Sequence, residues 1–256
     1  MPAHSTEAIV LHAFDYLESS RIIKLLTREH GLRSVLARGA RSSRKRFGAG
    51  LDLFVHGTAE LEVKQGRDLD TLTSFDVIRT RGGIGADLAR FTGASALAEL
   101  LLRFTQSDAD PELFDVAADT FDRIAIADGE AARDAAIAGA WRILTALGFA
   151  PSLDACGECQ RAFSDEEPVL FSPSAGGALC ETCASLARVG RKLPASARLA
   201  LVHWASGEDN AIALTEAEAR AHRRLLREFV IEHLSDGKPL RAFEAWETGA
   251  LDIFVG

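Results

Sequence analysis

All four cysteines of this 256-residue chain stand in two Cys-x-x-Cys pairs. The first pair is Cys156 and Cys159, the second is Cys180 and Cys183, and twenty residues separate the pairs. Each pair can place two sulfur atoms on one side of a tight turn, so together they supply four thiolates for a tetrahedral Zn²⁺. A four-sulfur shell leaves no open position for water or substrate. The spacing therefore predicts one structural zinc ion rather than a catalytic metal.

Three other uses of these cysteines stay open. Two disulfides would need an oxidising compartment, and the N-terminus lacks the charged-then-apolar pattern of a secretory signal. A redox-active Cys-x-x-Cys would stand alone at the start of a helix, whereas this one is duplicated. The last alternative is a degenerate site without metal. Of the four interpretations, the doubled pair favours zinc.

Charge is distributed unevenly along the chain. The whole chain has a net charge of -8, but residues 1–81 hold 13 Lys/Arg and 10 Asp/Glu, a net charge of +3. Glycine and serine make 39–50 a flexible loop, and Phe47 within it could stack on a base. A basic segment, residues 33–46, overlaps this loop. We expect it to contact DNA phosphates without recognising a base sequence. The alternative is that it is only a solvated loop. Its basic residues, with no acid among them, are Arg33, Arg38, Arg41, Arg44, Lys45 and Arg46.

The elements around these residues change type along the chain. Five or six short apolar runs in the first 80 residues predict a small β-barrel. These runs are Glu7–Phe14, Ile22–Thr27, Gly31–Ala37, Leu51–Val55, Ala59–Val63 and Leu69–Val77. From about Leu88 onward the apolar spacing is helical, before and after the cysteines. Thr215-x-x-Glu218 is a capping box that begins the longest helix, expected to end near Leu234.

The cysteine pairs therefore interrupt a helical domain. A segment of about 40 residues cannot bury enough apolar surface alone, which is why it would need a metal. Elsewhere the sequence has no phosphate-binding loop, no His-Glu-x-x-His and no Gly-x-Ser-x-Gly, so nothing nominates a catalytic site. His222 and His233 fall on the apolar face of the last long helix and are interpreted as core or boundary residues. No apolar run approaches the roughly 18 residues of a membrane span.

Several short motifs, in this order, resemble the RecO recombination mediators of bacteria. Single motifs are only moderately specific, but their order together with the cysteine pairs is specific, and the resemblance covers about residues 5–240. The motifs are Ala8-Ile-Val-Leu11, Tyr16-Leu-Glu-Ser-Ser20, Thr27-Arg-Glu-His-Gly31, Ala37-Arg-Gly-Ala-Arg41, Arg46-Phe-Gly48, Leu69-x-x-Leu72 and Arg224-Leu-Leu-Arg227.

This resemblance implies an α+β multidomain protein: an N-terminal OB-fold β-barrel, then an all-α domain with a small four-cysteine zinc insertion. The expected divisions are 1–80 for the barrel, 81–150 and 191–242 for the helical domain, 151–190 for the insertion and 243–256 for a loosely held tail. The resemblance also implies a non-catalytic cytoplasmic protein, associated with the nucleoid, that binds single- and double-stranded DNA and anneals complementary strands. With its partner RecR it would help load the RecA recombinase on strands coated by single-strand-binding protein.

The acidic C-terminal tail of single-strand-binding protein needs a cationic site of its own. Four arginines that lie beside apolar residues on the last long helix are the candidates: Arg220, Arg223, Arg224 and Arg227. Ordinary surface pairing of these arginines is the alternative. Three rival functions stay open for the chain: a zinc-ribbon transcription or translation factor, a zinc enzyme such as a deaminase, and a purely structural interaction protein. The deaminase would need a His/Cys ligand set and a His-x-Glu motif, which the sequence lacks.

Overall fold

The structure is a computed structural model of the chain. It describes residues 3–40, 47, 51–63, 69–105, 108–187, 190–207, 212–234 and 239–248. The chain divides into two compact units, residues 1–126 and 127–256. Within the described residues, no helix is long and apolar enough to cross a membrane.

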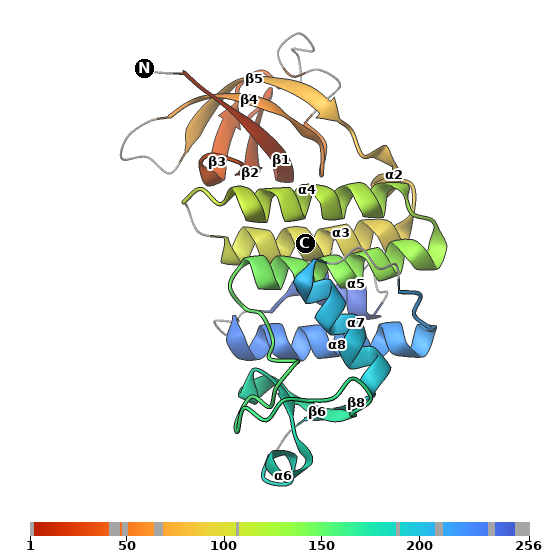
Figure 1. The fold of residues 1–256 in the computed structure, drawn as a ribbon. Helices are drawn as coiled ribbons and strands as arrows, with labels where there is room; N and C mark the ends of the chain where they lie inside the picture. Colours follow the sequence, from red (N-terminus) through yellow and green to blue (C-terminus); the bar gives the residue numbers. More distant parts are fainter. Residues whose placement is uncertain are drawn as a thin grey trace. The chain divides into compact units, whose positions relative to one another are not determined.

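The first unit begins with a closed five-stranded barrel, coloured red to orange in Figure 1. Its strands are β1 (Ala3–Tyr16), β2 (Ser20–Thr27), β3 (Gly31–Ala37), β4 (His56–Glu62) and β5 (Asp70–Arg79). The order around the barrel is β1-β2-β3-β5-β4, antiparallel except where β3 meets β5. Every second residue of a strand points to the same side, and in this barrel one side is the core. Ile23 of β2, Val35 of β3 and Phe75 of β5 are fully buried there. The barrel predicted from the sequence is confirmed.

One expected strand is wrong. Leu51–Val55 is an irregular segment without strand structure, because Phe54 has a left-handed backbone with φ of 67° that interrupts an extended run. Its apolar residues were still a correct sign of burial, since Leu51, Phe54 and Val55 are almost inaccessible to solvent. Phe47 is 2% exposed and belongs to the barrel core, so in this structure it is not available to stack on a base.

The first unit continues with α2 (Gly82–Gly85), α3 (Leu88–Phe104) and α4 (Pro111–Ile126). The carboxylate of Asp87 caps α3 by accepting a hydrogen bond from the Arg90 backbone N–H at 3.0 Å. Arg81, just before α2, is buried and ties the barrel to α4. Its guanidinium donates to the Phe54 carbonyl at 2.8 Å, the Ala118 carbonyl at 3.0 Å and the Asp122 carboxylate at 2.6 Å.

The longer helices described in the second unit are α5 (Gly129–Ala146), α7 (Ala195–Ser206), α8 (Glu216–His233) and α9 (Arg241–Thr248). The expected capping box is present, with the Thr215 hydroxyl accepting from the Glu218 N–H and the Glu218 carboxylate accepting from the Thr215 N–H. Part of the expected tail is helical, because Phe243 and Trp246 of α9 are buried. Residues 249–256 lie outside the described part of the chain.

A small sheet, not anticipated from the sequence, lies between α5 and α7 in the chain. Its strands are β6 (Val169–Ser172), β7 (Gly177–Leu179) and β8 (Arg191–Leu193), in the order β7-β6-β8. The 3₁₀ turn η1 (Pro173–Ala175) joins β6 to β7, and α6 (Glu181–Ala184) follows β7. Phe171 of β6 is fully buried, with its ring centroid 6.2 Å from that of Trp141 and 5.9 Å from that of Phe229. The insertion therefore shares the aromatic core of α5 and α8.

The two compact units differ from the domains expected from the sequence. The first unit groups α3 and α4 with the barrel, whereas the sequence assigned 81–150 to the helical domain. The division at about residue 80 and the limits of 151–190 and 191–242 stay predictions.

The buried guanidinium of Arg81 leads to a prediction about stability. In Arg81→Met, the Phe54 and Ala118 carbonyls lose a donor and Asp122 loses a buried partner. We expect the free energy of unfolding to fall by about 3 kcal/mol, measured by chemical denaturation. Arg79→Met is the matched control, because Arg79 also pairs with Asp122 but its side chain is 56% exposed, and should cost less than about 1 kcal/mol. Equal losses in the two variants would contradict this role for Arg81.

Candidate metal centre and nucleic-acid interface

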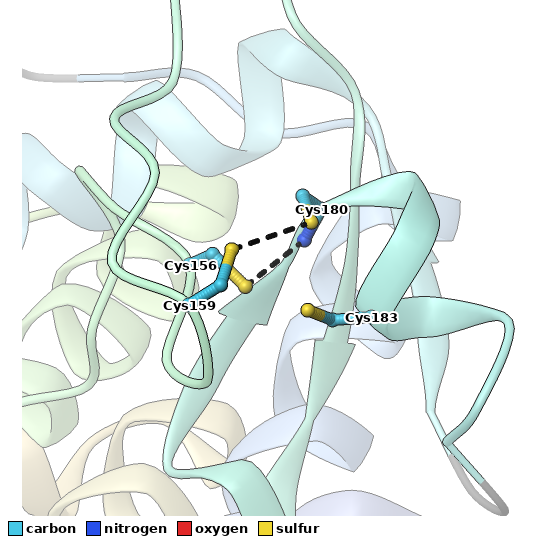
Figure 2. A group of neighbouring side chains, drawn as sticks. All are labelled: Cys156, Cys159, Cys180 and Cys183. Atoms are coloured by element: carbon cyan, nitrogen blue, oxygen red, sulfur yellow. Dashed lines mark hydrogen bonds between the residues drawn. The ribbon is translucent and has the colours of Figure 1, made fainter.

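The four cysteines of the insertion converge on one point (Figure 2). Their sulfur atoms all lie within 4.8 Å of one another, and the Cys159 and Cys180 sulfurs are 3.8 Å apart. Cys156 and Cys180 are buried, Cys183 is half-buried and Cys159 is exposed. The structure therefore brings together all four residues that the spacing selected.

The first pair lies on a tight turn before β6. The Gln160 N–H donates to the Cys156 carbonyl at 2.9 Å, and Gln160 has a left-handed backbone with φ of 60°. Gly157 within the turn donates its N–H to the Ala178 carbonyl at 2.9 Å. A Cβ on Gly157 would lie 2.7 Å from the Ala175 carbonyl oxygen, so glycine permits the close approach that sets the turn against β7.

The second pair begins at the end of β7. Cys180 is the N-cap residue of α6, and its carbonyl accepts from the Ala184 N–H at 2.8 Å. One helical turn then brings Cys183 to the same side as Cys180 (Figure 2). The Cys180 N–H donates to the Cys156 sulfur at 3.4 Å, which links the two pairs directly.

Thiols this close together influence one another's ionisation. Burial raises the pKa of Cys156, but backbone N–H groups of Cys159, Cys180 and Glu158 outweigh it and lower that pKa to about 6. The hydrogen bond with Cys180 and burial instead raise the pKa of Cys183 to about 12. The ionisation of these thiols is therefore coupled, as expected for groups of like charge in contact. A bound cation would favour the thiolate form of all four.

The donor set fits zinc. Zn–S bonds of about 2.3 Å place the sulfurs of a tetrahedral site about 3.8 Å apart, the separation of Cys159 and Cys180. The remaining sulfurs are near enough to close a tetrahedron with small rotations of their side chains. Four soft thiolates with no carboxylate or water position suit zinc better than magnesium or calcium.

Arg198 of α7 holds the insertion, and the sequence analysis did not identify it. The residue is 2% exposed and donates to the Leu153 carbonyl at 3.1 Å and the Ser164 carbonyl at 2.5 Å. Its guanidinium also lies 5.6 Å from the centre of the Phe163 ring. The signal in the sequence was a single arginine within an apolar helical run, where a charge needs a specific partner.

The basic segment predicted to bind DNA is only partly described. Arg38 is exposed just after β3. The Arg33 side chain is 32% exposed, donates to the His30 carbonyl at 2.9 Å and lies 3.9 Å from the Asp70 carboxylate. Arg41, Arg44, Lys45 and Arg46 lie outside the described residues. The described part of the segment therefore runs along β3, from Arg33 near its start to Arg38 just after its end.

The four arginines expected to bind a partner do not share one environment. Arg223 is mostly buried, donates to the Trp246 carbonyl at 3.0 Å and so fastens α9 to α8. Arg227 pairs with the Glu247 carboxylate at 2.7 Å, and Arg224 lies 3.9 Å from it. A cavity of about 490 Å³ is lined by Arg220, Arg224, Arg227, Glu244, Glu247 and Thr248. Three of the arginines therefore face one hollow, partly neutralised by acids of α9.

Comparison with known proteins covers both units. The model "Recombination protein O N terminal" matches residues 1–81, and "Recombination protein O C terminal" matches residues 85–242. The DNA repair protein RecO of Anaeromyxobacter sp. strain Fw109-5 is 36% identical over 239 residues, which are 92% of this chain and 93% of that protein. The RecO protein of Anaeromyxobacter sp. strain K is 38% identical over 243 residues, again 92% and 93% of the two chains. That of Gloeobacter violaceus is 33% identical over 88% of this chain and 85% of its own. The chain belongs to the RecO family of DNA repair and recombination proteins.

Proposed function

We propose that this protein is a non-catalytic recombination mediator that binds single- and double-stranded DNA and anneals complementary strands. With RecR, it helps load RecA on strands coated by single-strand-binding protein, in the cytoplasm at the nucleoid. The observation that carries the proposal is the family match over both units. A closed barrel within an N-terminal segment of net charge +3, in a chain of net charge -8, supports it, because such barrels commonly bind polyanionic strands.

Zinc in this proposal is structural. Cys156, Cys159, Cys180 and Cys183 would hold one Zn²⁺, which joins the turn before β6 to α6. The insertion's own cluster contains few large apolar side chains, so cross-linking by a metal would replace part of the missing core. Arg161 lies beside this centre, and hydrogen bonds to Glu167 and to the Cys180 sulfur raise its pKa. Its charge would offset part of the net negative charge of a zinc tetrathiolate.

The metal assignment predicts about one zinc per chain in protein purified without added metal. Cys180→Ser should lose the zinc, and amides of 152–187 should lose protection in hydrogen exchange, whereas β1–β3 should keep theirs because all four ligands lie in the second unit. Ser185→Ala is the control, since Ser185 is exposed beside the second pair and is not a ligand. Much less than one zinc by elemental analysis would contradict the assignment.

The proposed DNA contact predicts that reversing the charge of three residues in the basic segment lowers the affinity for DNA of any sequence. Arg41→Glu with Arg44→Glu and Arg46→Glu should weaken binding to every sequence about equally. Each lost phosphate contact should reduce the slope of log affinity against log salt by about 0.7 for single strands. The same variant should fail to anneal complementary oligonucleotides coated with the cognate single-strand-binding protein.

A control variant with the same net charge as the first variant separates local phosphate contacts from the effect of the protein's overall charge. It reverses three arginines elsewhere, in α3, α4 and α9: Arg103→Glu, Arg123→Glu and Arg241→Glu. This control should keep most of the affinity and the salt slope. Parental binding by the first variant at several salt concentrations would mean that the segment is a solvated loop.

The partner assignment places the acidic tail of single-strand-binding protein in the hollow between α8 and α9. Arg220 and Arg224 are the better targets for a test than Arg223, because their side chains are 65% and 57% exposed whereas Arg223 anchors Trp246. A bound tail would have to compete with Glu247 for Arg224 and Arg227. The site would therefore be moderate in affinity and sensitive to salt.

This competition predicts opposite effects for two changes. Arg220→Glu with Arg224→Glu should abolish binding of a labelled tail peptide while annealing of bare DNA survives. Glu247→Gln should instead tighten peptide binding, because it frees Arg224 and Arg227 from an intramolecular carboxylate. A fluorescence titration measures both. Unchanged affinity in the double variant would move the search to other basic positions, such as Arg142, Arg191 and Lys192.

A further inference from the structure

Large apolar side chains are exposed at the β1–β2 hairpin of the barrel. Phe14 is 42% exposed, Tyr16 is 43% exposed and Leu17, the first residue of the turn, is 75% exposed. Neither aromatic ring is needed to fill the barrel, whose core is made by other residues. Exposed rings placed together on a strand are a common sign of a binding surface.

The pairing of the strands shows which residues surround these rings. Phe14 pairs with Ile22 and His12 with Lys24, and these continue to Leu36 and Ser34 of β3. The residues in between, such as Ile23 and Val35, are buried inside the barrel. The opposite side of the three strands is therefore one outer surface, which we call the aromatic face. It consists of His12, Phe14, Tyr16, Ile22, Lys24, Ser34 and Leu36.

The seven residues of the aromatic face include no acid, and one end of this face lies at the end of the barrel where Arg38 follows β3. Tyr16 pairs with Ser20, and Arg21 pairs with Ala37 across the next strand pair. The end of β1, the start of β2 and the end of β3 thus meet at the same end of the barrel. Arg38 is exposed immediately after Ala37. Two acids lie near the rings: Asp15 of β1 is paired with Arg21 at 3.0 Å, and Glu18 is exposed in the hairpin turn.

The spacing of the rings distinguishes between forms of DNA. Residues two apart on a strand are about 6.8 Å apart, which is about twice the 3.4 Å repeat of stacked bases in a duplex. Phe14 and Tyr16 can therefore each accept a base only from a strand whose bases are unstacked. In a duplex, the faces of the bases are covered by their neighbours. A protein partner would need no basic rim, whereas a polyanion does.

We propose that Phe14 and Tyr16 form a base-stacking subsite for single-stranded DNA, at the end of the barrel where Arg38 of the basic segment is exposed. This inference rests on the proposed function and deepens it. The guanidinium groups contact the backbone of either form of DNA, and the two rings add affinity for the single strand alone. With this subsite, one barrel would bind both single- and double-stranded DNA but would bind the single strand more tightly.

The test is a comparison of three ligands with one double variant. Phe14→Ala with Tyr16→Ala should bind a thymidine oligonucleotide on the order of tenfold to a hundredfold more weakly than the parent. Its affinity for a duplex, and for an abasic phosphodiester of the same length, should not change. The slope of log affinity against log salt should also be unchanged, because no phosphate contact is removed.

Two control variants complete the test. Phe14→Tyr with Tyr16→Phe keeps both rings and should bind the single strand like the parent. Ile78→Ala changes a side chain of β5 that is 54% exposed and should also leave binding unchanged.

The outcomes separate the subsite from the wider proposal. If the parent protein binds none of the three ligands, DNA binding itself is wrong. If the parent binds and the alanine variant binds the thymidine oligonucleotide equally well, the stacking subsite is wrong and the aromatic face belongs to a protein partner. An equal loss for duplex and single strand would also overturn it, since bases in a duplex cannot reach the rings. Crosslinking of a 5-iodouracil oligonucleotide to residues 12–17, located by mass spectrometry, would support it directly.

Discussion

Buried arginines hold irregular segments of this protein together. Arg81, Arg133 and Arg198 are each less than a tenth exposed, and each donates to backbone carbonyls far away in the sequence. A guanidinium stays charged at any relevant pH, so burying it requires that its donors find acceptors with good geometry. Arg133 shows the pattern most fully, since it donates to the Leu214 carbonyl and pairs with Asp134 and Glu216. Arg133 and Asp134 together position the residue before the N-cap of α8, since the Leu214 N–H donates to the Asp134 carboxylate at 3.0 Å.

This constraint changes how the basic residues of the chain are interpreted. A DNA-binding protein needs cations that can reach phosphates, and arginines that satisfy the fold cannot do so. Arg223 lies in a basic helix segment, yet its main contact is the Trp246 carbonyl. Arg38 of the basic segment, by contrast, is exposed to solvent just after β3. Counting arginines along the sequence does not separate these two kinds, whereas burial and carbonyl partners do.

The sequence was informative wherever one local rule decided the outcome. Cysteine spacing selected four residues whose sulfurs lie together, alternation predicted the barrel, and Thr215 with Glu218 marked the start of α8. It was less informative where tertiary contacts override local pattern. Leu51–Val55 is apolar but not a strand, because the left-handed Phe54 packs its ring 5.2 Å from that of Phe121 on α4. Trp246 looked like part of a tail because Arg223, its partner on α8, lies 23 residues away in the sequence.

A protein that anneals strands must hold bases weakly enough to release them. Each base-pair step formed gains about 1.4 kcal/mol of stacking, whereas stacking on an aromatic ring contributes about 1–3 kcal/mol per base. A long row of rings would therefore compete with the duplex that the protein is proposed to make. Phe14 and Tyr16 engage only two bases, so most of a bound strand would be held through its phosphates with its bases available. Neutralising phosphates with the basic residues of the N-terminal unit would also lower the repulsion between two strands. A small stacking subsite beside a larger cationic one is the arrangement that captures a single strand and still allows it to pair.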